Sequence, residues 1–181
     1  ESAAFLATLQ DEVQRLSRLT HALLDMSDLQ SVPRNDVILL SPMIDEVFAD
    51  LAPLAERNGI SLSREGENIT VVGSDMLLCR MFSNLVENAV KYNHPGGSVY
   101  ITLSPGPVVT VSDTGIGIPK AHQDRIFERF YRVDKSRSKQ TGGTGLGLAI
   151  VKHITERHGA RIELSSRTGV GTEITVRFKK E

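Results

Sequence analysis

The chain has 181 residues, of which 40% are hydrophobic and 24% are charged, which suffices for one globular domain with an appended element. The net charge of −1 argues against the basic surface that nucleic-acid-binding proteins usually carry, so no nucleic-acid partner is expected. The single cysteine, Cys79, excludes an internal disulfide, and no apolar run approaches the roughly 20 residues of a membrane span.

The first predicted element is a long amphipathic helix over residues 1 to about 30. Its apolar positions recur at steps of three and four, as in helical bundles and coiled coils: Leu6, Leu9, Val13, Leu16, Thr20 and Leu23. Such a stripe needs a covering partner, which we expect to be another helix of the same protein or a second copy. Because the sequence begins without methionine inside this helix, we expect the chain to be part of a longer protein.

A polar stretch over residues 31–40, with Pro33, predicts a linker between this helix and a second domain, residues 41–181. Ser41 and Pro42 predict an N-cap and a first helical position, and Ser74 or Asp75 predicts a second helix start.

Helices and strands alternate along the second domain. We predict helices over 41–59, 75–92 and 145–158, a helix-like turn over 121–130, and strands over 60–64, 69–72, 98–103, 108–112, 161–165 and 173–178. This order predicts an α+β fold, a two-layer sandwich in which helices cover one face of a mixed sheet, preceded by one long bundle helix.

The helix predicted over 75–92 carries an unusual polar face. Asn84, Asn88, Lys91 and Tyr92 are separated by steps that place them on one side of a helix. An amide oxygen is a suitable ligand for Mg²⁺, which proteins usually bind with few side-chain oxygens plus phosphates. An ordinary solvated face would give the same pattern, so this helix alone leaves both interpretations open.

Two glycine-rich segments follow. Asp113 ends a predicted strand and precedes Gly115 and Gly117, so its carboxylate could accept a hydrogen bond from a planar ligand lying close to the backbone. Residues 142–148 enter a predicted helix, where amide groups and the helix dipole favour an anion. This second segment matches neither a Walker A loop nor a dinucleotide-binding fingerprint. An ordinary turn and a flexible hinge are the respective alternatives.

In this order and spacing, these segments resemble the N box and the two glycine boxes of the ATP-binding domain of sensor histidine kinases, with residues 127–132 resembling the F box. That domain has the Bergerat fold, which is shared with gyrase, Hsp90 and the mismatch-repair ATPases. The resemblance covers residues 41–178 and implies an ATP-dependent protein histidine kinase that uses ATP and Mg²⁺.

The resemblance also implies roles for individual residues. Asn88 would bind Mg²⁺, Lys91 and Arg132 would contact phosphate with help from Arg129, and Asp113 would bind the adenine amino group, supported by Thr172. The other nucleotide-binding residues that it implies are Asn84, Tyr92, Gly115, Gly117, Ile118, Tyr131, Gly143, Thr144, Gly145, Leu146, Gly147 and Leu148. Residues 117–146 would form a mobile lid over ATP.

The position of Asn84 carries a water-activating glutamate in ATP-hydrolysing relatives. An amide takes no proton near neutral pH, so Asn84 cannot act as a base, and phosphoryl transfer is favoured over hydrolysis. Glu87 lies about 100° away from Asn88 on the helix, and we interpret it as a partly exposed charge.

Residues 1–30 resemble the second helix of the dimerisation and phosphotransfer hairpin. The acceptor histidine belongs to the first helix, and its motif, His-Glu/Asp-x-Arg/Lys-x-Pro, does not occur in this sequence. We therefore expect the chain to bind ATP without phosphorylating itself. His21 is expected to be a bundle or surface histidine, and none of the others has zinc-ligand spacing: His94, His122, His153 and His158.

The partners implied are the phosphotransfer helix of the same or a sister protomer, a response-regulator receiver domain, and a second copy in the full-length homodimer. The chain would form a cytoplasmic part of a bacterial plasma-membrane sensor without itself entering the membrane. Two alternatives remain at this stage, an ATP-driven conformational clamp and a degenerate protein-interaction module.

Overall fold

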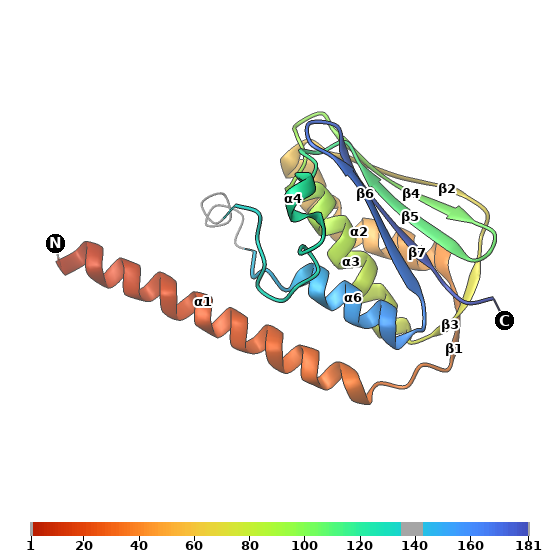
Figure 1. Cartoon of the computed structure of the whole chain (residues 1–181), viewed down its shortest axis with the longest axis horizontal. Helices are drawn as coiled ribbons and strands as arrows, with labels where there is room; N and C mark the ends of the chain where they lie inside the picture. Colours follow the sequence, from red (N-terminus) through yellow and green to blue (C-terminus); the bar gives the residue numbers. More distant parts are fainter. Residues whose placement is uncertain (1, 135–142, 181) are drawn as a thin grey trace.

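The computed structural model describes residues 2–134 and 143–180. Its main sheet has five strands in the order β2-β4-β5-β7-β6, in which β2 and β4 are parallel and the other pairs antiparallel. The strands are β2 (Ser61–Gly66), β4 (Ser98–Ser104), β5 (Val108–Asp113), β6 (Arg161–Arg167) and β7 (Gly171–Arg177). Helices α2 (Leu40–Asn58), α3 (Asp75–Lys91) and α6 (Gly147–Arg157) cover one face (Figure 1), which confirms the predicted two-layer α+β sandwich.

The core lies between the sheet and these helices. Along β4, Val99, Ile101 and Leu103 are buried, whereas Tyr100 between them is exposed, as expected for a strand with one covered face. Phe82 of α3 is fully buried against this layer. Each such side chain contributes roughly 1.5–3 kcal/mol by leaving water, so this contact fixes α3 on the sheet.

The first helix of this domain begins differently from the prediction. Its first residue is Leu40, whose N–H donates to the Ile69 carbonyl at 3.0 Å, and the Ser41 N–H donates to Asn68 Oδ1 at 3.2 Å. Ser41 itself is buried, and no described residue pairs with its hydroxyl. The predicted cap at Ser41 is wrong because the acceptors come from Asn68 and Ile69, which are distant in sequence.

A small second sheet precedes that helix. Strand β1 (Asp36–Leu39) pairs antiparallel with β3 (Thr70–Gly73), so the predicted linker over 31–40 contains a strand that the sequence analysis did not predict. This pairing carries the chain from the N-terminal helix to the start of α2.

The start of α3 agrees with the prediction, and His158 makes an additional contact there. Ser74 is the N-cap residue, and its hydroxyl accepts from the Leu77 N–H at 3.3 Å. The Ser74 N–H donates to His158 Nε2 at 3.0 Å, while His158 Nδ1 lies 2.8 Å from the Ile154 carbonyl. Neutral His158 with its proton on Nδ1 satisfies both contacts, so it joins the end of α6 to the start of α3.

This histidine predicts a pH-dependent stability. Burial lowers the pKa of His158 below its ordinary value of 6.5, the hydrogen bond to the Ile154 carbonyl offsets part of this, and the charges of Arg34 and Arg157 lower the pKa further by smaller amounts. The unfolded chain therefore binds the proton more readily, and the free energy of unfolding should fall as the pH drops below about 6.5 towards the folded pKa.

Urea unfolding at pH 7.5 and pH 5.5 measures the effect. His158→Gln should lose roughly 1–2 kcal/mol at pH 7.5 and show a smaller loss between the two pH values than the wild type. The exposed His94 provides the control, because His94→Gln should leave the pH dependence unchanged. An unaltered pH dependence in His158→Gln would contradict the assignment.

The N-terminal helix α1 (Ser2–Asp28) runs beside the sandwich, and its N-terminal end projects beyond it (Figure 1), which confirms the predicted long helix. Its apolar stripe is exposed along much of its length, at Leu6, Leu9, Val13, Leu16 and Leu23. The following short helix η1 (Leu29–Ser31) anchors it, because Leu29 is buried in the core and the Arg157 guanidinium donates to the Gln30 carbonyl. Within the described ranges, no helix combines the length and apolarity required to cross a bilayer.

Candidate functional site

A pocket of about 660 Å³ opens between α3, the ends of β5 and β7, the start of α6 and the irregular segments that precede α6. The predicted site residues that line it are Asn84, Asn88, Lys91, Tyr92, Asp113, Gly117, Ile118, Tyr131, Arg132, Gly143, Thr144, Gly145, Gly147, Leu148 and Thr172. The fold thus brings together segments that are far apart in the sequence.

Helix α3 supplies one wall of the pocket. The amide nitrogen of Asn84 is buried and finds no hydrogen-bond partner among the described residues. About two turns later, Lys91 Nζ forms an ion pair with Glu87 Oε1 at 2.6 Å. The predicted partly exposed charge at Glu87 is confirmed, because its side chain is 39% exposed. The helix therefore supplies the pocket with a lysine whose partner can be exchanged, near an amide nitrogen that no described residue pairs.

Asp113, the last residue of β5, lines the end of the pocket opposite to Lys91. Its Oδ1 accepts from the Gly115 N–H at 2.7 Å and from the Thr172 N–H at 3.3 Å. Burial raises the pKa of the Asp113 carboxyl above its ordinary value, and these two hydrogen bonds offset part of the rise. Both contacts use the same carboxylate oxygen, Oδ1.

Thr172 supports Asp113 through its backbone amide and not through its side-chain hydroxyl. Its amide binds the carboxylate, whereas its hydroxyl lies 2.8 Å from the Ser166 hydroxyl. Ser166 in turn accepts from the Ile118 N–H at 2.8 Å, so the loop after β5 is held to the β6–β7 hairpin.

Glycine is required at two points of this loop. A side chain on Gly115 would place Cβ 2.3 Å from the Tyr92 carbonyl oxygen, and one on Gly117 would place it 2.1 Å from the Arg167 carbonyl oxygen. Gly117 also has φ +70°, a left-handed conformation that few other residues adopt readily. The backbone therefore lies directly on α3 and on the hairpin, which leaves the pocket open.

The segment resembling the F box contacts the second glycine segment through backbone atoms. The Phe130 N–H donates to the Gly145 carbonyl at 2.9 Å, and both residues have positive φ, 64° and 76°. Gly143 and Gly147 lie further along this wall. A Cβ on Gly143 would be 3.2 Å from the Arg132 guanidinium, and a Cβ on Gly147 would be 3.7 Å from the Asn88 amide. The two segments and α3 converge at this end of the pocket.

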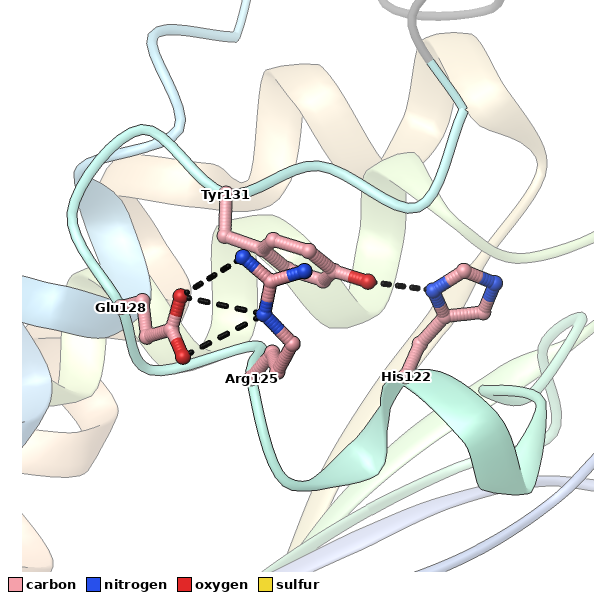
Figure 2. A network of polar contacts seen from close by, with 4 residues as sticks. All are labelled: His122, Arg125, Glu128 and Tyr131. Carbon is pink, nitrogen blue, oxygen red and sulfur yellow. Dashed lines mark hydrogen bonds and ion pairs between the residues drawn. The ribbon is translucent and has the colours of Figure 1, made fainter.

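The predicted helix-like turn over 121–130 is shorter in the structure, where α4 (Lys120–Gln123) is followed by turns. Figure 2 shows the Tyr131 phenol pointing towards the His122 ring while Arg125 lies over the Tyr131 ring. Irregular backbone therefore carries the pocket residues Tyr131 and Arg132.

Three predicted site residues do not line the pocket. Gly115 is buried beneath it, Leu146 is fully buried in the core, and Arg129 is exposed outside it. Part of the predicted lid, residues 135–142, lies outside the described residues, and this part includes Gly142.

Sequence reasoning missed the apolar lining of the pocket. Beyond helix α3, which contributes Leu85 and Ala89, this lining includes Val111, Ile116, Pro119, Ile126, Val133, Ile150 and Ile174. The alternation in β5 and β7 could have indicated Val111 and Ile174, whereas the irregular segments offer no comparable periodic signal.

The chemistry of the pocket suits a magnesium ion that is bound jointly with phosphates. Within 2–134 and 143–180, no three His, Cys, Asp or Glu side chains come close enough to hold a metal ion by themselves. The Asn88 amide lies close to Gly147, at the start of α6. An asparagine oxygen can bind a hard cation, and the adjacent helix N-terminus favours the phosphate oxygens that would supply further ligands.

Comparison with known proteins agrees with this geometry. Residues 73–181 match the family described as histidine kinase-, DNA gyrase B-, and HSP90-like ATPase. The chain is 37% identical to the sensor-like histidine kinase SenX3 of Mycolicibacterium smegmatis, over 95% of this chain and 47% of that protein. It is 39% identical to the sensor histidine kinase RppB of Synechocystis sp., over 98% of this chain and 41% of that protein.

Solved structures show the same fold. The mycobacterial sensor histidine kinase MprB superposes with a TM-score of 0.66 and 29% identity, covering 78% of this chain and 95% of that one. The chain spans under half the length of the two curated relatives. The family match covers well over half of the chain, which therefore belongs to the histidine kinase-, DNA gyrase B- and HSP90-like ATPases.

Proposed function

We propose that this chain is the ATP-binding catalytic part of a bacterial sensor histidine kinase, which transfers the γ-phosphoryl group of ATP to a histidine on a phosphotransfer helix. One observation carries the proposal: a single pocket joins the half-buried Asp113 carboxylate to an end lined by Asn88, Lys91 and Arg132. Membership of the ATPase family and similarity to proteins named sensor histidine kinases support it.

Asp113 would recognise adenine. Because Oδ1 is occupied by two backbone amides, Oδ2 is available to accept a hydrogen bond from the adenine amino group. The apolar side chains of Val111, Ile126 and Ile174 would contact the faces of the base. These contacts favour adenine over guanine, which has a carbonyl oxygen at the position of the amino group.

The other end of the pocket would hold the phosphates. Lys91 would exchange its ion pair with Glu87 for a phosphate oxygen, and Arg132 would contact a second one. The amides at the start of α6 would add hydrogen bonds in line with the helix dipole. Asn88 would bind Mg²⁺, which neutralises phosphate charge when bound.

Asn84 favours phosphoryl transfer over hydrolysis. Its side chain lies in the pocket, but an amide accepts no proton near neutral pH and cannot activate water. This argues against an ATP-driven clamp that depends on hydrolysis. The joined pocket, with its base-binding and phosphate-binding ends, argues against a degenerate interaction module.

The remaining roles concern the larger protein. We propose that residues 1–30 belong to the dimerisation and phosphotransfer hairpin and that residues 41–181 form the catalytic domain. A response-regulator receiver domain would accept the phosphoryl group, and the whole would function on the cytoplasmic side of a membrane sensor. The exposed stripe of α1 supports a helical partner, because apolar residues at this spacing form bundles.

The same stripe predicts weak self-association. At high concentration, sedimentation equilibrium should detect dimers, and Leu16→Glu should remove them because it introduces a charge into the 56% exposed apolar position at Leu16. Gln14→Glu, at an exposed position in the polar face of α1, is the matched control and should leave the dimer intact. A wild type that remains strictly monomeric would contradict this prediction.

Phosphoryl transfer can be tested by adding a separate hairpin that carries the acceptor histidine of a related sensor kinase. With γ-labelled ATP and Mg²⁺, we expect label on the histidine of the hairpin and none on this chain. Rapid release of inorganic phosphate with no labelled hairpin would instead favour the ATP-driven clamp.

A further inference from the structure

His122 contacts the pocket only through another residue. It lies on α4 and does not line the pocket, but its Nδ1 forms a hydrogen bond with the Tyr131 hydroxyl. Tyr131 does line the pocket, and the two rings are 6.0 Å apart between centroids (Figure 2). A change at His122 therefore reaches the pocket through the phenol.

Helix α4, which carries His122, is fixed to the main sheet. The neighbouring Gln123 amide donates to the Ile118 carbonyl at 2.9 Å and to the Ser166 carbonyl of β6 at 3.0 Å. These bonds hold α4 against the β6–β7 hairpin and against the loop that carries Gly117. His122 thus projects from an anchored element, whereas Tyr131 projects from an irregular one.

A second contact holds the ring from its face. The Arg125 guanidinium lies 4.5 Å from the Tyr131 ring centroid, within the range of a cation–π interaction. Glu128 binds the same guanidinium, with Arg125 Nη2 3.2 Å from Glu128 Oε2. The ring is therefore held at its hydroxyl by His122 and across its face by the Arg125–Glu128 pair.

We propose that His122 is a positioning residue for nucleotide binding, acting through the Tyr131 hydroxyl; this inference rests on the proposed function of the pocket. An aromatic ring fixed before binding loses less conformational entropy when a ligand packs against it. The His122–Tyr131 bond supplies that preorganisation by connecting the irregular pocket wall to the anchored helix α4.

The test is a double-mutant cycle measured by calorimetric titration with a non-hydrolysable ATP analogue and Mg²⁺. His122→Ala and Tyr131→Phe should each weaken binding by about three- to tenfold, the size of one neutral hydrogen bond. The double variant should bind no more weakly than Tyr131→Phe alone, because the hydroxyl through which His122 acts is already gone.

Two further variants separate positioning from general damage to the fold. His122→Asn places an amide near the position of Nδ1 and should restore affinity to within about twofold of the wild type. The exposed His94 lies in a turn outside the pocket lining, and His94→Ala should leave affinity unchanged. Thermal melting of each variant without nucleotide shows whether the fold is intact.

Three results would overturn the inference. His122→Ala could bind as tightly as the wild type, its effect could persist in full in the Tyr131→Phe background, or His122→Asn could bind as weakly as His122→Ala. In each of these cases wild-type binding that depends on Asp113 would leave the proposed function standing. A folded wild type that binds no nucleotide would instead overturn the proposed function and this inference together.

Discussion

Replacing Asp113 with asparagine is expected to weaken binding of the ATP analogue by roughly 10- to 100-fold, because a hydrogen bond to a charged group contributes about 1.5–3 kcal/mol. The substitution keeps the size of the side chain. Its amide oxygen can still accept from the Gly115 and Thr172 amides, which now bind Oδ1. The NH₂ group then occupies the position of Oδ2 and presents a donor to the adenine amino group, where an acceptor is needed.

The same substitution should not destabilise the protein. Burial raises the pKa of Asp113, so the folded state binds its proton more readily than the unfolded state does. The stability linked to this group is present at low pH and is lost as the pH rises through the raised pKa, so the ionised carboxylate is unfavourable at neutral pH. A neutral asparagine avoids that cost, and we expect Asp113→Asn to melt no lower than the wild type at pH 7.

Calorimetric titration and thermal melting together check this prediction. Asp50 is exposed on α2, away from the pocket, so Asp50→Asn is the matched control and should change neither affinity nor melting temperature appreciably. Nucleotide binding by Asp113→Asn that equals the wild type would show that adenine is not recognised here.

A Gly117→Ala variant is expected to lose roughly 2–4 kcal/mol of stability, together with much of its nucleotide affinity. Two causes combine at this position. The φ of +70° strains any residue with a Cβ, and the added carbon would lie 2.1 Å from the Arg167 carbonyl oxygen. Since that contact is with backbone, either the loop or the β6–β7 hairpin must move. Ile118, which lines the pocket, would move with the loop.

Gly96→Ala isolates the first cause from the second. Gly96 has φ +84°, and a Cβ there would meet no atom within 4 Å. The free energy of unfolding of this control should fall by only about 1 kcal/mol, and the control should bind nucleotide as the wild type does. Urea unfolding of both variants compares them, and equal losses of stability would contradict the close approach of the loop to the hairpin.

The helical part of the site was predictable because it depends on periodicity alone. A period of 3.6 residues places Asn84, Asn88 and Lys91 on one face, and all three line the pocket. The N-cap at Ser74 followed equally from local chemistry. The exposed stripe of α1 also agrees with its sequence spacing.

Features that depend on distant partners were not predictable in this way. Asn68 caps α2 from 27 residues away, and His158 fixes the start of α3 from 84 residues away. No local pattern distinguishes either from an ordinary polar residue. Likewise, β1 looked like a linker because a short strand next to a proline has no periodicity of its own.

The segment around residues 120–134 was also difficult to predict, although it contributes to the site itself. It lacks regular structure beyond α4, so periodicity could not indicate which side chains face the pocket, and the family resemblance alone pointed to Tyr131 and Arg132. Tyr131 and Arg132 do line it, whereas Arg129 is exposed outside it. His122, for which the sequence predicted only that it lacks zinc-ligand spacing, contacts Tyr131 because the chain folds back at this point.

Calorimetric titration of the wild-type chain with a non-hydrolysable ATP analogue, with and without Mg²⁺, tests the central claim most directly. We expect adenine-dependent binding with a Kd in the micromolar range, about −8 kcal/mol, that is tighter with Mg²⁺ and absent for the guanine analogue. A chain whose melting curve shows it to be folded, but which binds no adenine nucleotide with or without Mg²⁺, would contradict the account.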